Sequence, residues 1–213
     1  MKKVLIVLAL VTAFAFATDS YFVEDQGPGG SGSDDLLQYD NGTGHWICYN
    51  IPYYGVWFDV VDFMPGAIGF DCDYAELVFY HHTSLPWDTD QISIELWNGD
   101  GAGATTIIRA DDVTATHNTP QNLNYATPVA LDRNFWLIAN TTVYSTDMLP
   151  TGFYDEFANF TGVAHTFASD DGVLWDPITA ASIEVNLMFR VEGTIITNAL
   201  ENGSWGAIKG LFR

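Results

Sequence analysis

Basic residues are scarce in this 213-residue chain, which has seven Lys and Arg against 27 Asp and Glu. Between Thr18 and Glu201 there is no lysine, and the only arginines are Arg109, Arg133 and Arg190. An acidic surface repels nucleic acid and anionic membranes. We therefore expect no nucleic-acid partner, and an environment of cationic partners, salt or Ca²⁺.

Long apolar runs are also missing, with one exception at the N-terminus. Two lysines precede an apolar run from Val4 to Phe16, and Ala15 and Ala17 supply the small residues of a cleavage site. This pattern predicts a Sec-type signal peptide over residues 1–17, cleaved near Ala17. A membrane anchor is the alternative, but it needs about 20 apolar residues and this run has roughly 13. We expect a secreted or cell-surface protein with no transmembrane segment in its mature form.

Cysteine is limited to Cys48 and Cys72. Both lie in strand-like runs, and in an oxidising compartment a disulfide between them is the default expectation. The bridge would close a loop of roughly 24 residues and add about 3 kcal/mol in the chain-entropy model. Two free buried thiols are the alternative. A metal site is disfavoured because no second Cys or His pair has ligand spacing.

Long helical periodicity is missing from the body of the chain, whereas period-two alternation recurs, for example at Ile92, Ile94 and Leu96. Short apolar runs separated by Gly, Pro, Asn and Asp are typical of antiparallel strands. The predicted strands are His45–Ile51, Val56–Phe63, Ile68–Phe70, Ala75–His81, Gln91–Trp97, Thr105–Ala110, Val113–Thr116, Phe135–Asn140, Val163–Ala168 and Ser182–Glu192. Together they predict an all-β fold, an antiparallel β-sandwich of jelly-roll-like type, with an up-and-down barrel as the alternative.

The sequence divides into four expected parts. The signal peptide at 1–17 precedes a flexible linker at 18–38, which includes a Gly- and Ser-rich stretch that cannot bury apolar area. The β-sandwich domain is expected at 39–193, and a C-terminal tail at 194–213.

Four segments of the expected domain resemble, in order, β-sandwich domains of bacterial secreted and cell-surface proteins found with type IX-like sorting signals. These segments are Tyr39–Trp46, Ile94–Gly103, Ser169–Trp175 and Asn186–Val191. In such domains a strand ending in Trp runs into an acidic, Gly-rich turn. The resemblance implies the fold and export, and it brings no catalytic residues. This chain lacks the sorting domain that usually ends type IX proteins.

The C-terminal tail instead resembles the short Trp-Gly-x-Ile-Lys endings of exported proteins from uncultivated bacteria. If Ser204 caps a short helix, its apolar residues share one face and its cations lie in the last turn. Such a helix is too short to be stable alone. We expect the tail either to dock on the sandwich or be disordered, or to be a recognition signal for an export, sorting or attachment system. The residues concerned are Trp205, Ile208, Lys209, Phe212 and Arg213.

Acidic turns are candidate cation sites. Asn98, Asp100, Asp170 and Asp171 offer hard oxygen ligands, of which Ca²⁺ takes six to eight. None of these turns matches an EF-hand loop. Alternatively, Asp and Asn make turns by bonding to their own backbone. No cofactor is expected other than structural Ca²⁺.

Enzyme motifs are missing, since no His-Glu-x-x-His or Gly-x-Ser-x-Gly pattern occurs. Asp71 and Asp73 would share one strand face, as a glycosidase pair could, although a chance solvated pair is the alternative. We expect no enzymatic activity.

Aromatic side chains are the remaining candidates for ligand binding, because sugar rings stack on Trp and Tyr. Tyr53, Tyr54 and Trp57 cluster near Pro52, and Trp87 lies in the expected loop at residues 84–88. Burial in the core is the alternative. The sequence thus favours an exported, acidic, non-enzymatic structural or interaction module, with an unknown protein or glycan partner. A carbohydrate-binding module, calcium-dependent or not, is the alternative, and a glycoside hydrolase is third.

Overall fold

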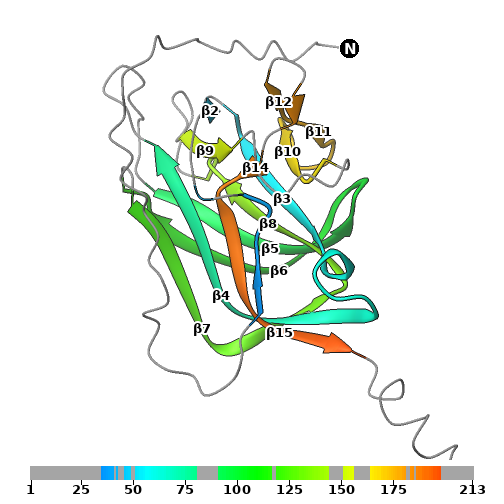
Figure 1. Cartoon of the computed structure of the whole chain (residues 1–213). Coiled ribbons are helices and arrows are strands. Elements are labelled where there is room, and N and C mark those ends of the chain that lie inside the picture. The colour runs from blue at the N-terminus through cyan, green and yellow to red at the C-terminus, as the bar shows by residue number, and fades with distance from the viewer. Residues whose placement is uncertain are drawn as a thin grey trace, which may run out of the picture.

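The computed structural model describes residues 35–40, 42, 46–48, 51–80, 91–116, 119–143, 151–155, 164–180, 183–184 and 186–197. Over these ranges the chain is all-β and forms two antiparallel sheets that pack as a sandwich (Figure 1). One 3-10 turn, η1 (Val60–Asp62), is the sole helical element of the described part. None of the described residues forms a helix long and apolar enough to cross a membrane. The predicted two-sheet sandwich is confirmed.

The first sheet has a body of four strands in the order β1-β15-β4-β7, with three short strands joined at one end of β4. Its long strands β4, β7 and β15 lie side by side in Figure 1. The strand bounds are β1 (Asp35–Leu37), β15 (Phe189–Thr197), β4 (Ala67–Tyr80), β7 (Thr119–Asp132), β9 (Thr151–Asp155), β14 (Asn186–Leu187) and β2 (Trp46–Cys48).

The second sheet has six strands in the order β11-β10-β3-β8-β5-β6. Two further short strands, β12 and β13, pair only with each other. The bounds are β11 (Asp176–Pro177), β10 (Thr166–Ser169), β3 (Tyr53–Asp59), β8 (Asn134–Asn140), β5 (Gln91–Asp100), β6 (Gly103–Thr114), β12 (Thr179–Ala180) and β13 (Ile183–Glu184).

Strand alternation places the main core between the two sheets. On β8, Phe135 and Leu137 point inward, and Phe135 stacks on Phe58 of β3 and Phe70 of β4 at centroid distances of 5.2 and 5.5 Å. Aromatic pairs at this spacing add to the stabilisation from area burial. These contacts join the sheets at the centre of the sandwich.

A second apolar cluster covers the outer face of the second sheet. Trp136 of β8 lies directly opposite Trp57 of β3 and Trp97 of β5, so three indoles form a row across three strands. Trp136 is fully buried beneath Trp175, with centroids 4.9 Å apart. This close approach needs a glycine at position 55, where a Cβ would lie 2.9 Å from the Trp175 ring. The outer face of this sheet is therefore packed at its centre.

Strand pairing extends on both sides of the predicted domain at 39–193. Asp35–Leu37 form a strand that pairs with Val191–Gly193 of β15, and the Asp35 carboxylate accepts a hydrogen bond from the backbone N–H of Ile195. The sheet thus takes in residues assigned to the linker at 18–38. It also continues to Thr197, past the predicted domain end at 193, because β15 keeps its pairing with β4.

The predicted Cys48–Cys72 disulfide is wrong, since Cys72 is a free, buried cysteine. Gly152 of β9 lies opposite both Cys48 and Phe79, which places Cys48 near the end of β4. Cys72 precedes Phe79 by seven residues in β4, a span of about 23 Å in a strand. A disulfide needs Cα atoms within about 7 Å. The Cys72 thiol instead donates to the Tyr74 carbonyl at 3.4 Å.

A buried ion network attaches the segment after β1 to the first sheet. Arg190 on β15 donates to both carboxylate oxygens of Asp40, at 3.0 and 2.5 Å, and to Glu76 on the paired strand β4 at 3.2 Å. Tyr74 completes the network by donating to Glu76 at 3.0 Å. Asp40 is 0%, Arg190 7% and Glu76 9% exposed.

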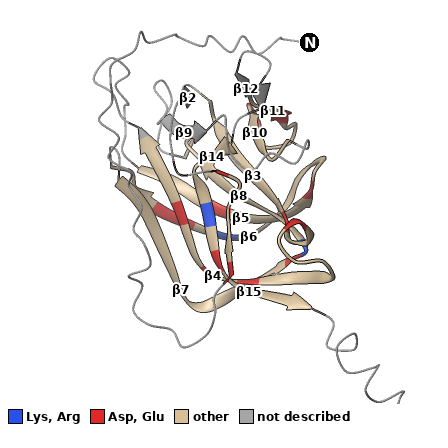
Figure 2. Cartoon of the chain, viewed as in Figure 1, with Lys and Arg blue, Asp and Glu red and all other residues tan. Residues whose placement is uncertain are grey.

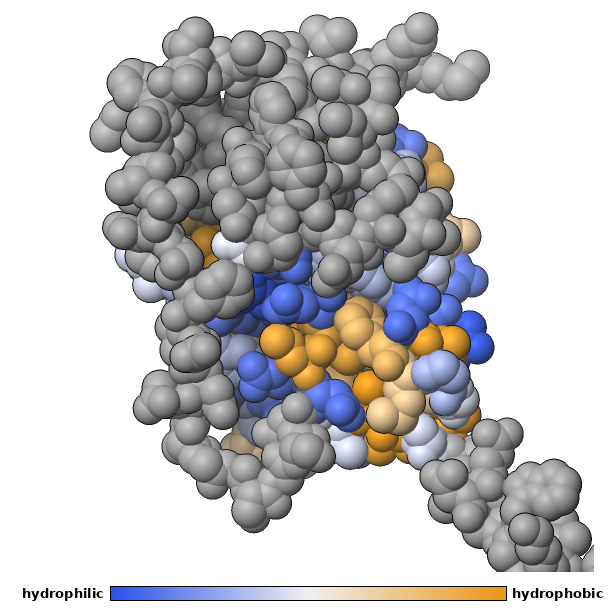
Figure 3. Space-filling model, in the orientation of Figure 1, coloured by the Kyte–Doolittle hydropathy of each residue, from blue (hydrophilic) through white to orange (hydrophobic). Residues whose placement is uncertain are grey.

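Charge is otherwise spread over the strands as isolated acidic positions, with few basic ones (Figure 2). On the face shown in Figure 3, apolar and hydrophilic residues of the described part lie next to each other. This face therefore does not present a uniformly acidic surface.

Candidate functional site

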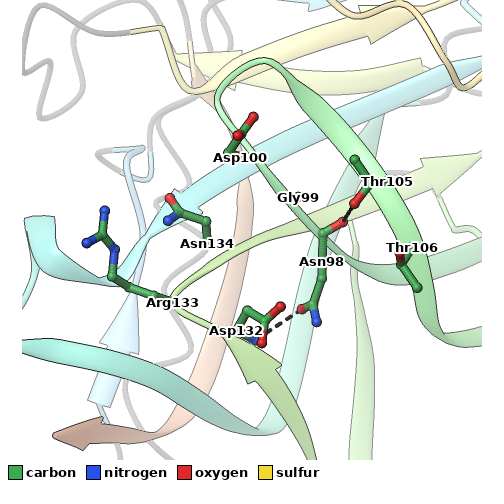
Figure 4. Close-up of a pocket in the computed structure, with 8 residues that line it drawn as sticks. All are labelled: Asn98, Gly99, Asp100, Thr105, Thr106, Asp132, Arg133 and Asn134. Atoms are coloured by element: carbon green, nitrogen blue, oxygen red, sulfur yellow. Dashed lines mark hydrogen bonds between the residues drawn. The ribbon is translucent and has the colours of Figure 1, made fainter. Parts of the chain in front are cut away.

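An open pocket of about 400 Å³ lies where two turns of the sandwich meet (Figure 4). One wall comes from the β5–β6 turn and the start of β6, and the other from the turn between β7 and β8. The lining residues are Asn98, Gly99, Asp100, Thr105, Thr106, Asp132, Arg133 and Asn134. All are polar residues or glycine, so their side chains can form hydrogen bonds, and none of these lining residues is aromatic.

Short hydrogen bonds fix the shape of the β5–β6 wall. The Asp100 carboxylate accepts a bond from the backbone N–H of Ala102 at 2.9 Å, as Asp commonly does in turns. The Thr105 hydroxyl donates to the Asn98 carbonyl at 3.0 Å, across the hairpin. The wall is thus held by its own backbone and leaves the second Asp100 oxygen for other contacts.

The two walls are joined by a direct bond. The backbone N–H of Asp132 donates to the Asn98 side-chain oxygen at 3.1 Å, which orients the Asn98 amide (Figure 4). Arg133 is held from outside the pocket by Asp59, at 3.2 Å from Nε to the carboxylate. Its backbone carbonyl accepts a bond from Val60 N–H at 3.1 Å. The β7–β8 turn is therefore attached both to the opposite wall and to the end of β3.

The base of the β5–β6 turn rests on the row of tryptophans. The Trp136 indole nitrogen donates to the Asp100 carbonyl at 3.1 Å. Gly101 lies so close to Trp57 that a Cβ there would be 3.0 Å from the ring. The pocket wall and the outer-face cluster consequently form one packed unit.

Two of the predicted cation ligands line this pocket and two do not. Asn98 and Asp100 are brought together by the hairpin, while Asp170 and Asp171 lie in the turn after β10. Asp171 accepts bonds from the backbone N–H groups of Val173 and Leu174 at 2.8 and 2.9 Å.

These backbone bonds, that from Leu174 foremost, lower the pKa of the Asp171 carboxyl. Within the described ranges, no group of three or more His, Cys, Asp or Glu side chains could hold a metal ion. The turn-forming alternative thus accounts for Asp100 and Asp171.

The residues named for the predicted aromatic binding face do not all lie on one surface. Tyr54 is fully buried in the main core, whereas Tyr53 and Trp57 point to the outer face, where both are partly buried. Trp87 lies outside the described residues. The exposed large apolar side chains of the described part include no aromatic residue; they are Leu36, Met64, Ile68, Ile107, Ile108, Val143, Val173 and Leu174.

Other predicted features also fall outside the described residues. They are the signal peptide at 1–17, most of the linker, and the five tail residues Trp205, Ile208, Lys209, Phe212 and Arg213. Asp71 and Asp73, the possible glycosidase pair, lie on β4 and do not line the pocket.

Sequence reasoning missed one whole wall of the pocket, namely Asp132, Arg133 and Asn134. Their signal was present as three consecutive polar residues between the apolar residues 129–131 and 135–139. It went unused because β7 was not recognised as a strand.

Comparisons of the chain with protein-family models, with curated proteins and with solved structures find no match. Of the predicted resemblance to bacterial surface domains, the structure supports the fold, an all-β two-sheet sandwich.

Proposed function

We propose that this chain is an exported, non-enzymatic interaction module that binds an extracellular ligand in the pocket between the β5–β6 and β7–β8 turns. The observation that carries the proposal is the pocket itself. Its volume is within the range of about 300–1,000 Å³ that is usual for ligand sites, although it is an open depression and not the enclosed, mainly apolar cavity typical of such sites. Its walls are cross-linked by the Asp132–Asn98 bond, so the site is formed before any ligand arrives.

Carbohydrate is the ligand class that the lining favours, which makes a carbohydrate-binding module the second candidate function. Sugar hydroxyls both donate and accept hydrogen bonds. The pocket offers matching groups, since amides do both and carboxylates accept. The side chains best placed for this are Asn98, Thr106 and Asn134, because they are uncharged.

The jelly-roll type of sandwich is likewise part of this proposal. Its support is that the chain crosses from one sheet to the other at β3–β4, β4–β5, β6–β7 and β7–β8. The predicted N-terminal signal peptide supports export, and the excess of acidic residues supports an extracellular setting.

The mature chain should be tested on a glycan array and by pull-down on insoluble polysaccharides, with Ca²⁺ and with EDTA. A double variant, Thr106→Val with Asn134→Ala, removes two hydrogen-bonding groups and should weaken binding about 10-fold to 100-fold. The matched control is Asn122→Ala, on the exposed part of β7 and outside the pocket. Absence of any glycan binding would exclude carbohydrate as ligand. Equal binding by the double variant and wild type would exclude the pocket.

A further inference from the structure

His165 lies in an aromatic stack at the edge of the second sheet, just before β10. Its ring is 3.6 Å from the Tyr39 ring centroid at an interplanar angle of 19°, and 5.0 Å from Trp57 at 14°. The imidazole is thus enclosed between two rings, and the residue is only 3% exposed. Among the described residues it is the sole histidine.

Both ring nitrogens of His165 face oxygen atoms. Nδ1 lies 2.9 Å from the Trp57 carbonyl, which can only accept, so Nδ1 carries the proton in the neutral ring. Nε2 lies 3.5 Å from the Asp62 carboxylate. The same Asp62 oxygen accepts a 2.8 Å bond from the Tyr39 hydroxyl. Protonation at Nε2 gives Asp62 a second donor and places a charge inside the stack.

The charged and titratable groups facing the ring come from three elements. Asp62 belongs to η1, Asp59 to the end of β3, and Tyr39 to the segment after β1. Burial lowers the pKa of His165, against the attraction of the two carboxylates. Burial also raises the pKa of Tyr39 far above its ordinary range, so this hydroxyl stays protonated and its bond to Asp62 does not titrate.

The groups that contact His165 also support both walls of the pocket. Trp57, which stacks on His165, packs under Gly101 of the β5–β6 turn. Asp59, whose N–H lies 3.4 Å from the Tyr39 hydroxyl, holds Arg133 of the opposite wall. A change of charge or position at the imidazole therefore reaches the β5–β6 wall through Trp57, and the opposite wall through Tyr39 and Asp59.

We propose that His165 is a proton-sensing positioning residue that couples pH to the shape of the pocket through Trp57 and Asp59. As a device that regulates ligand binding, it rests on the proposed function of the pocket. Neutral His165 keeps Trp57 stacked and the walls as described. Protonated His165 draws on the Asp62 carboxylate, alters the stack and shifts the turns that carry Asn98 and Asn134.

The test is a nuclear magnetic resonance titration of the mature chain from about pH 8 to about pH 5, a range that brackets the ordinary histidine pKa. The His165 ring proton and the side-chain amides of Asn98 and Asn134 are followed together. We expect all three to shift with one common midpoint below pH 6.5. The amide of Asn122, which is remote from the pocket, should stay constant.

A His165→Phe variant keeps a flat ring in the stack but cannot titrate, so the two pocket amides should lose their pH dependence. If that variant does not fold, His165→Gln, which cannot titrate either, takes its place. The wild-type midpoints of His165 and the two pocket amides are then compared directly. The inference is overturned if His165 does not titrate in this range, if the pocket amides stay still while it does, or if they shift equally in the variant. Because no ligand is needed, a failed glycan screen would exclude carbohydrate as the ligand and leave this result standing.

Discussion

Replacing Arg190 with Met should strongly destabilise the protein, because it removes the cation from the buried network while keeping most of the side-chain volume. Two carboxylates would then remain without their partner, Asp40 at 0% and Glu76 at 9% exposure. Three hydrogen bonds from the guanidinium, at 3.0, 2.5 and 3.2 Å, would be lost with it.

The expected loss follows from the cost of leaving buried charges unpaired. Removing one partner of a buried ion pair costs about 3–5 kcal/mol. The free energy of unfolding of a domain of this size is about 5–15 kcal/mol. Arg190→Met should therefore remove a large share of the total. Neutralising both acids in the same background, by Asp40→Asn and Glu76→Gln, should restore part of the loss.

Urea unfolding followed by tryptophan fluorescence measures this free energy. The control is Arg109→Met, which breaks the ion pair between Arg109 and Asp111. The Arg109 side chain is 51% exposed, and because exposed ion pairs contribute little, this variant should change stability little. If Arg190→Met lost no more stability than Arg109→Met, the network would not be buried as described. The reasoning would also fail if the neutralised triple variant were the least stable.

Further predictions concern other positions. Gly55→Ala should cost about 1–3 kcal/mol in urea unfolding, because its Cβ would meet two indoles; an unchanged midpoint would show that the outer-face cluster yields easily. Asp171→Ala should lower the melting temperature equally with Ca²⁺ and with EDTA, since its oxygen bonds the backbone; a calcium-dependent difference would instead reveal a metal role. Burial raises the pKa of the Cys72 thiol to about 12, so the folded protein should resist thiol reagents at this residue, and non-reducing peptide maps should show no Cys48–Cys72 pair. Because burial lowers the pKa of His165, the neutral ring contributes its full stability above about pH 6.5. Below that pH the free energy of unfolding should fall by at most about 1.4 kcal/mol per pH unit. Urea unfolding at several pH values should show this decrease in the wild type, and His165→Phe should lack it.

The period-two pattern was sufficient to predict strands where one face is apolar. β5 and β8 follow the predicted Gln91–Trp97 and Phe135–Asn140 closely. The predicted Val56–Phe63 strand ends early, because the Asp59 carboxylate accepts a bond from Val61 N–H and starts η1. This is a local capping effect that alternation alone does not report.

β7 shows why part of the fold could not be predicted. It contains Pro120 and Pro128 and few apolar residues, which is the pattern of a loop. β7 pairs only with β4, so the N–H groups along its other side donate to no neighbouring strand of the described part. Proline, which lacks an N–H group, is tolerated at such positions. Edge position is a property of the assembled sheet, and the pocket residues of the β7–β8 turn were missed with it.

One residue of the predicted aromatic face, Tyr54, lies elsewhere for a simpler reason. Tyr53 and Tyr54 are neighbours in a strand, so their side chains point to opposite faces and cannot share one binding surface. The structure buries Tyr54 in the main core and places Tyr53 on the outer face. The disulfide prediction failed because sequence separation does not reveal that β9 separates Cys48 from β4.

The central claim is that the pocket between the two turns binds the ligand. The most direct measurement is nuclear magnetic resonance mapping of the mature chain with a bound oligosaccharide from the glycan screen. The account predicts that the side-chain amides of Asn98 and Asn134 and the Thr106 backbone shift on binding, with little change at Asn122. Binding that shifts Asn122 or other distant strands and leaves the pocket resonances unchanged would contradict it.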